Sequence, residues 1–196
     1  MNLNDRIRGY LPVVIDVETG GFDHKHDALL EICAVIIGLD DTGEFFNKEV
    51  IHFHIEPFTG AKIDSSALEF NKIDVDNPFR LAVSEHKALS QIFQSVNNEI
   101  ESENCSRAIL VGHNAFFDLG FIKSATDRAK LKSPFHKFST IDTVSLSALC
   151  FGETVLAKAA IKAKIDWDDS EAHSALYDTQ KTAELFCHIF NQQKFE

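Results

Sequence analysis

The chain of 196 residues has no long apolar run. Its most apolar stretch, residues 29–37, is interrupted by Glu31 and is far shorter than the roughly 20 residues that a membrane-spanning helix needs. We also expect no secretory leader, because Arg6 and Arg8 precede an apolar segment that Asp16 soon breaks. We therefore expect a cytoplasmic protein that is neither secreted nor inserted in a membrane.

Closely spaced cysteines are also missing. No two of the four form the C-x-x-C pair of a zinc or redox site, and we expect free thiols in a reducing compartment. They are Cys33, Cys105, Cys150 and Cys187. Basic residues are scarce too: 19 lysines and arginines stand against 30 acids, and the net charge is −11. This charge repels nucleic acid at long range, so any nucleic-acid function requires local compensation.

The spacing of apolar residues predicts one α/β domain over residues 1–196, with no internal repeat or linker. Expected strands lie at 11–17, 29–39, 51–55, 108–111 and 138–141. Expected helices lie at 84–100, which Ser84 would cap, at 115–131, at 142–149, which Asp142 would cap, and at 176–190. The order β-β-β-α-β-α-β-α-α predicts a mixed sheet with an antiparallel opening followed by crossovers.

Asp16 and Glu18 are the first candidates for chemistry. Side chains two apart on a strand share a face, so these carboxylates would lie about 7 Å apart. The same spacing at residues 74/76 and 166/168 indicates only solvated surface. Asp16 differs because it interrupts an apolar strand, where a charge is costly.

Two further candidates follow later in the chain. Asp118 comes shortly after the strand at 108–111, at a strand end where ligand sites gather, although it could also be a first-turn acid that complements the helix dipole. His173 and Asp178 open the last helix, and their spacing of five places His173 in the loop or first turn, leaning over Asp178. A capping and solubility role is the alternative for this pair.

Four carboxylates and one imidazole from distant segments predict a hydrolytic metal site. Oxygen ligands in that number suit Mg²⁺ or Mn²⁺ better than zinc. Because imidazole is a poor Mg²⁺ ligand and titrates near neutral pH, a histidine beside the ions is free to act as a base. The expected chemistry is two-metal phosphoryl transfer.

The motifs D-x-E, N-x-x-F-D and H-x-A-x-x-D, in this order, resemble those of the DEDDh 3′→5′ exonuclease superfamily. Longer segments, including V-V-I-D-V-E-T, H-F-H-I-E-P-F and A-H-S-A-L-Y-D-T, resemble its ribonuclease T branch. The resemblance implies a ribonuclease-H-like fold, a five-stranded mixed sheet flanked by helices. It also implies that Asp16, Glu18, Asp118 and Asp178 bind two divalent ions and that His173 is the general base.

The 17 phenylalanines provide a separate indication. Most must be core, but Phe22, Phe70, Phe117 and Phe138 lie in turns, in polar stretches or beside a candidate acid. Aromatic rings can stack on single-stranded bases, and the resemblance implies that role for these four. Ser66 stands where the family usually has a glutamate that contacts the terminal base, so the resemblance does not fix the base preference.

Local basic residues could offset the negative net charge. Residues 119–140 carry Lys123, Arg128, Lys130, Lys132 and Lys137 against one acid. Together with Arg6, Arg8 and Arg107 they could contact phosphates, although ordinary solvated helix charges are the alternative. The resemblance implies a homodimer in which the basic surface of one subunit faces the active site of the other. Glu101 departs from the lysine of relatives and predicts weaker or more salt-sensitive binding.

The sequence thus predicts a Mg²⁺-dependent, homodimeric 3′→5′ exoribonuclease that releases nucleoside 5′-monophosphates. The resemblance implies trimming of short single-stranded 3′ ends of tRNA and other structured RNA, with activity on single-stranded DNA. Two alternatives stay open. One is another DEDDh enzyme, such as a proofreading subunit or an oligoribonuclease, and the other is a nucleic-acid-binding module without catalysis.

Overall fold

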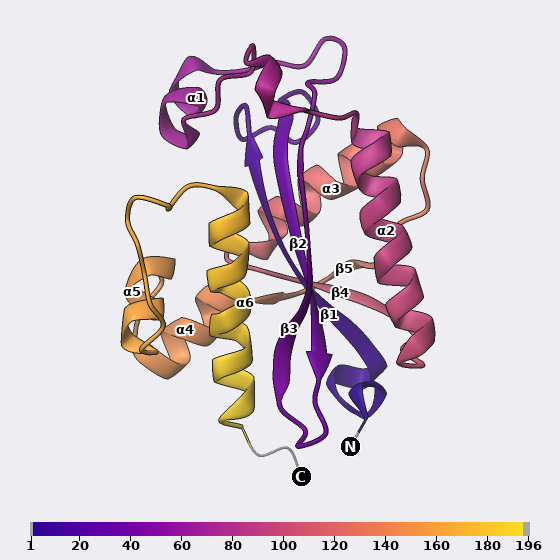
Figure 1. Ribbon diagram of the computed structural model, residues 1–196, viewed down its shortest axis with the longest axis vertical. Helices are drawn as coiled ribbons and strands as arrows, with labels where there is room; N and C mark the ends of the chain where they lie inside the picture. Colours follow the sequence, from indigo (N-terminus) through magenta and orange to yellow (C-terminus); the bar gives the residue numbers. More distant parts are fainter. Residues whose placement is uncertain (1, 194–196) are drawn as a thin grey trace.

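A five-stranded sheet with helices on both faces forms the protein, as seen in a computed structural model that describes residues 2–193. Figure 1 shows the sheet nearly edge-on, with α4, α5 and α6 on one side and α2 and α3 on the other. The strands are β1 (Tyr10–Thr19), β2 (Leu29–Leu39), β3 (Phe45–His54), β4 (Arg107–Gly112) and β5 (Phe135–Asp142). The helices are α1 (Ser65–Asn71), α2 (Glu85–Ser102), α3 (Ala115–Ala129), α4 (Thr143–Phe151), α5 (Leu156–Lys162) and α6 (Ala175–Asn191). Short 3₁₀ turns cover Leu3–Asp5, Ile7–Gly9 and Pro78–Arg80.

The strand order is β3-β2-β1-β4-β5. The first three strands form an antiparallel meander, while β4 and β5 join it in parallel after helical crossovers. This arrangement confirms the predicted mixed α/β sheet. It places β1 at the centre, with β3 and β5 as the edge strands.

Burial explains why the strands differ in sequence. Nearly every residue of β2 is buried, because helices cover both faces of the sheet, and the strand therefore reads as a continuous apolar run. The edge strand β3 was expected to bury Ile51 and Phe53 while exposing His52 and His54, but all four are half-buried. The apolar and polar residues of β3 therefore alternate in the sequence, but the two sets are buried to a similar degree.

Local capping residues define two of the predicted helices. The Ser84 hydroxyl accepts a hydrogen bond from the Lys87 N–H at 3.3 Å at the start of α2. The Asp142 carboxylate accepts one from the Val144 N–H at 2.8 Å at the start of α4. Both predicted caps are confirmed.

The structure corrects several boundaries. Helices α1 and α5, each of seven residues, were not predicted. Strands β3 and β5 begin earlier than expected, and α3 ends at Ala129 rather than at residue 131. Ile55, predicted as part of a strand, forms an isolated bridge with Val83 instead.

Within residues 2–193, no single helix is both long and apolar enough to cross a membrane. Only α4 and α5 taken together, with a 44° bend between them, meet the length and composition of a broken span.

Candidate active site

Asp16 and Glu18 lie where β1 runs beyond its parallel neighbour. Strand β4 pairs with β1 only as far as Val14, whereas β2 continues alongside β1 to Thr19. The two acids therefore point to one face from a stretch of β1 whose other edge has no strand beside it. That edge is open to side chains from the segment that follows β4.

Asp118 occupies this open edge. Strand β4 ends at Gly112, and α3 begins three residues later and carries Asp118 in its first turn. The Asp118 Oδ1 atom accepts a hydrogen bond from the backbone N–H of Val17 at 3.1 Å. A Cβ atom at Gly112 would lie 3.2 Å from Asp118 Oδ2, so this close approach favours glycine. Asp118 thus accepts the hydrogen bond that a neighbouring strand would otherwise accept from Val17 of β1.

Asp178 and His173 come from the start of α6. His173 lies in the loop two residues before the helix, with φ at +68°, and its backbone N–H donates to Asp178 Oδ2 at 3.3 Å. Its exposed ring packs on Phe70, with centroids 4.2 Å apart. The prediction that His173 precedes the helix and adjoins Asp178 is confirmed. Its contact with Asp178 is made by the backbone, while the imidazole faces α1.

Asp16, Glu18, Asp118 and Asp178 form what we call the carboxylate cluster. Asp16, Glu18 and Asp178 each offer one oxygen, and these three oxygens lie within 4.8 Å of one another. Burial raises the pKa of Asp16 well above its usual range, and the negative charges of Asp118 and Glu18 add to the effect. Asp118 therefore adjoins the other three through Asp16.

The other pKa values of the cluster are raised in the same direction. Burial, followed by the charge of Glu31, raises the pKa of Glu18 to about 8. Burial likewise raises the pKa of Asp118 to about 8, although the hydrogen bond from Val17 partly opposes it. The pKa of Asp178 also rises through burial. Burial thus raises the pKa of all four acids, because it penalises their charged forms.

Divalent cations fit this donor set. Among residues 2–193, no lysine or arginine forms an ion pair with any of the four acids. Asp178 Oδ1 is buried and has no hydrogen-bond partner within the same described part of the chain. A buried carboxylate oxygen is costly unless it is paired or coordinates a metal, and hard oxygen donors suit hard cations. The cluster therefore has the composition of a divalent metal site.

Comparison with known proteins agrees with this geometry. Residues 13–186 match the RNase_T family model, whose description is exonuclease. Ribonuclease T of Vibrio campbellii is 55% identical over 99% of this chain and 92% of its own length. Ribonuclease T of Vibrio cholerae is 56% identical over 99% of this chain and 88% of its own length.

The chain belongs to the ribonuclease T family of exonucleases. Solved structures with lower identity share its fold. Escherichia coli exonuclease I in complex with a dT13 oligonucleotide matches with a TM-score of 0.72 at 16% identity, over 94% of this chain and 42% of that one. A 3′-exonuclease that recognises a histone mRNA stem-loop matches with a TM-score of 0.71 at 14% identity, over 93% and 64%. The predicted ribonuclease-H-like exonuclease fold is confirmed.

Three of the predicted phenylalanines of this ribonuclease T family member lie on segments that also carry residues of the site or contact them. Phe22, 91% exposed, follows β1 and meets Phe117 edge to face at 6.1 Å. Phe70 is carried by α1, whose last residue, Asn71, donates a side-chain hydrogen bond to the Thr19 carbonyl oxygen at 3.2 Å. Phe70 thus contacts His173, and Phe117, the chain neighbour of Asp118, contacts Phe22.

Phe138 lies apart from the other three in its ring contacts. It is 80% exposed on β5 and packs on His136, with centroids 4.6 Å apart, and His136 in turn contacts Tyr10. No ring contact among residues 2–193 joins Phe138 to Phe22, Phe70 or Phe117. Its proposed stacking role therefore depends on a substrate that extends beyond the other rings.

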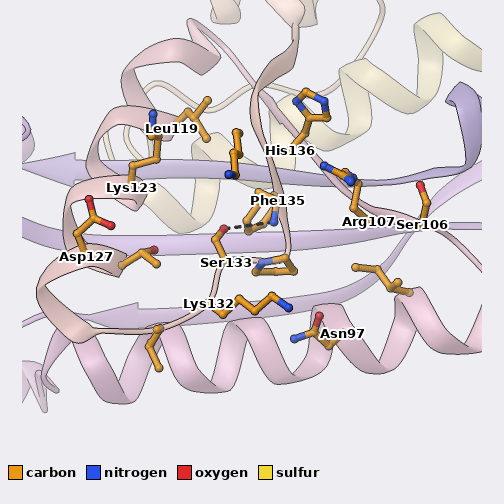
Figure 2. Close-up of a pocket in the computed structure, with 15 residues that line it drawn as sticks. Asn97, Ser106, Arg107, Leu119, Lys123, Asp127, Lys132, Ser133, Phe135 and His136 are labelled. Carbon is orange, nitrogen blue, oxygen red and sulfur yellow. Dashed lines mark hydrogen bonds between the residues drawn. The ribbon is translucent and has the colours of Figure 1, made fainter.

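A cleft of about 870 Å³ lies between α2, α3 and the start of β5, and four basic side chains line it (Figure 2). We call it the basic cleft; its basic residues are Arg107, Lys123, Lys132 and Lys137. It therefore contains the predicted contacts Arg107 and Lys132. The predicted contacts from the N-terminal segment do not line the cleft: the Arg6 guanidinium stacks over Phe45 at 4.8 Å, and that of Arg8 lies 5.9 Å from the Tyr10 ring.

Sequence reasoning missed one charged residue beside the carboxylate cluster, Glu31. Glu31 is 5% exposed on β2 and pairs in register with Glu18. It interrupts an apolar strand just as Asp16 does, so the rule that selected Asp16 also applies to Glu31. Two histidines of β3 contact Glu31, and this group is treated separately below.

Proposed function

We propose that this chain is a metal-dependent 3′→5′ exoribonuclease that trims short single-stranded 3′ ends of structured RNA, tRNA among them. The observation that carries the proposal is the convergence of Asp16, Glu18 and Asp178, with Asp118 beside them, without a lysine or arginine ion pair within residues 2–193. Membership of the ribonuclease T family supports RNA as the substrate. A DNA-binding relative of the same fold supports activity on single-stranded DNA ends.

The carboxylate cluster would hold two Mg²⁺ ions, with Mn²⁺ as the alternative, because all of its donors are oxygens. When bound, the ions supply positive charge that stabilises both the ionised carboxylates and the charge that develops on the scissile phosphate. Asp16 and Glu18 are fixed by the sheet, and Asp118 by its bond to Val17. Asp178 is oriented by the backbone N–H of His173.

His173 is proposed as the general base. Its imidazole would take the proton of the attacking water, whose oxygen forms the new bond to the phosphorus of the terminal phosphodiester. The bond from phosphorus to the 3′ oxygen breaks, and the electron pair leaves with the shortened chain. The product is a nucleoside 5′-monophosphate. The exposed loop position of His173 lets its ring reach a bound 3′ end, while Phe70 limits the directions in which it can turn.

Bases near the 3′ end would stack on the exposed rings of Phe22 and Phe70 and on the half-buried ring of Phe117, with Phe138 further along the strand. Stacking is worth about 1–3 kcal/mol per base and tolerates any sequence. Ser66, at the start of α1, gives this region a hydroxyl where relatives were expected to carry a carboxylate. The terminal base would therefore be selected weakly.

A homodimer is part of the proposal. None of the four acids of the carboxylate cluster lines the basic cleft, so a second copy would supply the phosphate contacts for the active site of the first. Arg6 and Arg8, which lie outside the cleft, would add charge at its periphery. Free thiols at all four cysteines support a reducing, cytoplasmic location.

The test uses a tRNA with a few extra 3′ nucleotides, incubated with the parent, Asp178→Asn and His173→Ala proteins, with Mg²⁺ or with EDTA. The parent should shorten the tail one nucleotide at a time only with Mg²⁺. His173→Ala should lower kcat by roughly 10²–10⁴-fold. His26→Ala, which changes an exposed histidine paired with Asp23, is the matched control and should leave trimming unchanged. Equal trimming by the parent, Asp178→Asn and His173→Ala proteins would overturn the assignment.

A further inference from the structure

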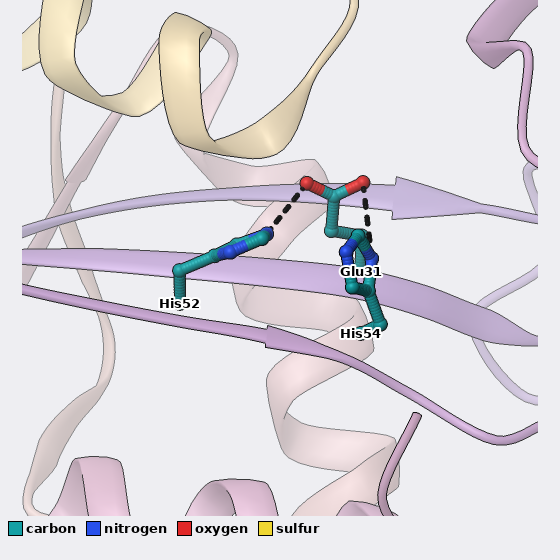
Figure 3. A group of neighbouring side chains, drawn as sticks. All are labelled: Glu31, His52 and His54. Atoms are coloured by element: carbon teal, nitrogen blue, oxygen red, sulfur yellow. Dashed lines mark hydrogen bonds and ion pairs between the residues drawn. The ribbon is translucent and has the colours of Figure 1, made fainter. Parts of the chain in front are cut away.

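Glu31, His52 and His54 form a compact group that the proposed nuclease reaction does not use; we call it the imidazole cluster. Glu31 lies on β2, and His54 is its partner in register on β3. His52, two residues earlier on the same strand, shares the face of His54. Figure 3 shows both imidazoles directed at the Glu31 carboxylate.

The hydrogen bonds of the imidazole cluster are incomplete. His52 Nε2 lies 2.7 Å from Glu31 Oε1, within hydrogen-bond distance. His54 Nδ1 lies 3.9 Å from Glu31 Oε2, too far for a hydrogen bond. His54 Nδ1 is also buried and has no hydrogen-bond partner among residues 2–193. A buried polar atom without a partner is costly, so this nitrogen indicates a missing ligand.

The donor set selects a class of ligand. One atom from each of the three residues lies within 4.8 Å of the others, and the set comprises two imidazole nitrogens and one carboxylate oxygen. Zinc and related transition-metal ions prefer this combination, whereas Mg²⁺ prefers oxygens. Burial lowers the pKa of His54, which keeps its ring neutral and able to coordinate.

Access and charge also fit a bound cation. The Glu31 side chain is 7% exposed, whereas those of His52 and His54 are 25% and 35% exposed, so an ion can reach the two imidazoles from solvent. Glu31 lies in register beside Glu18 and adds to the negative charge there. A cation at the imidazole cluster would therefore offset charge beside the carboxylate cluster without sharing its ligands.

We propose that Glu31, His52 and His54 bind a divalent transition-metal ion of the zinc class, separately from the carboxylate cluster. The alternative is a purely structural contact, in which Glu31 is held by its hydrogen bond with His52 and by the nearby charge of Arg80. The proposal predicts measurable zinc binding at these residues, and the alternative predicts none.

The experiment measures Zn²⁺ binding by equilibrium dialysis in an Asp16→Asn, Asp178→Asn background. This background removes oxygen ligands of the carboxylate cluster and makes the result independent of nuclease activity. One zinc ion per chain is expected. Adding His54→Gln, which keeps a polar side chain, or His52→Gln should weaken binding at least about tenfold. His26→Gln is the matched control, because His26 also lies 2.8 Å from a carboxylate, that of Asp23, but on an exposed turn.

A spectroscopic measurement distinguishes ligation from nonspecific binding. Co²⁺ added to the same background should give visible absorption bands typical of nitrogen ligation, and His54→Gln should shift or remove them. Thermal unfolding of each variant establishes that it is folded. No zinc binding in the background protein, or equal loss with His26→Gln and His54→Gln, would overturn the proposal.

Discussion

At the scale of single residues, the carboxylate cluster links metal content to stability. The pKa of Glu18 is about 8 in the fold and near 4.5 in an unfolded chain. Between these values the folded protein keeps a proton that the unfolded chain has lost, so raising the pH destabilises the metal-free fold. The free energy of unfolding then falls by at most about 1.4 kcal/mol per pH unit for each such carboxyl. In EDTA, the free energy of unfolding should therefore fall from pH 5 to pH 8.

Added Mg²⁺ should restore stability more strongly at pH 8 than at pH 5, because metal binding requires deprotonated ligands. Denaturant unfolding at both pH values, with and without Mg²⁺, measures this difference. Glu18→Gln should flatten the pH dependence in EDTA, since its amide does not titrate. Equal Mg²⁺ stabilisation at the two pH values would contradict the linkage.

The sequence predicted Asp16 from a cost argument and the other acids from their positions and the family motifs, but it could not give the distances between them. Asp16 was identifiable because a charge in an apolar strand requires a reason. Its proximity to Asp118 depends on β4 ending before β1 does, which is a property of sheet register. Glu31 met the same cost criterion and was passed over, because its partners lie on an edge strand whose histidines looked like an exposed polar face.

At the scale of secondary structure, the long helices were predictable and the two seven-residue helices were not. Helix α2 carries an amphipathic stripe over 18 residues and a Ser84 cap. Helices α1 and α5 have seven residues each, and neither has a side-chain cap hydrogen bond. Helices this short depend on tertiary packing, which no local pattern reports. The omission affects the site, because α1 carries Phe70 and contacts His173.

The loop before α6 provides a prediction about how His173 is positioned. The Tyr177 hydroxyl accepts a hydrogen bond from the Asp168 N–H at 2.5 Å, and the Trp167 ring packs edge to face on Tyr177 at 5.2 Å. These contacts tie the loop to the helix that carries Asp178. Trp167→Ala should loosen the loop and lower kcat roughly tenfold, because small displacements of a catalytic group are costly.

Metal affinity and KM should change little in Trp167→Ala, since the carboxylate cluster and the stacking rings remain in place. Steady-state trimming kinetics and a Mg²⁺ titration separate these quantities. Trp167→Phe, which keeps an aromatic ring, should recover most of the rate. A loss of Mg²⁺ affinity equal to the loss of kcat would indicate general unfolding of the site instead.

At the scale of the whole molecule, the net charge of −11 gave little guidance to the location of function. Buried acids account for part of the excess, and the basic cleft concentrates positive charge on another surface. The net charge adds the buried acids and the basic cleft together. Only the fold separates them.

The proposed dimer makes a prediction that mixing can test. A protomer with Asp178→Asn keeps its basic cleft but lacks a working carboxylate cluster. A protomer with Arg107→Ala and Lys132→Ala has the opposite defect and should bind RNA weakly, with a salt dependence reduced by about one phosphate contact per lost charge. Each variant alone should trim tRNA tails slowly at physiological salt.

If the cleft of one copy serves the carboxylate cluster of the other, a re-equilibrated equal mixture should regain activity. Half of the dimers would then be mixed, each with one complete composite site, so roughly a quarter of the parent activity is expected. Trimming rates before and after subunit exchange measure this gain, and light scattering establishes the mass of the dimer. No gain after exchange, with dimers present, would show that each chain uses its own cleft.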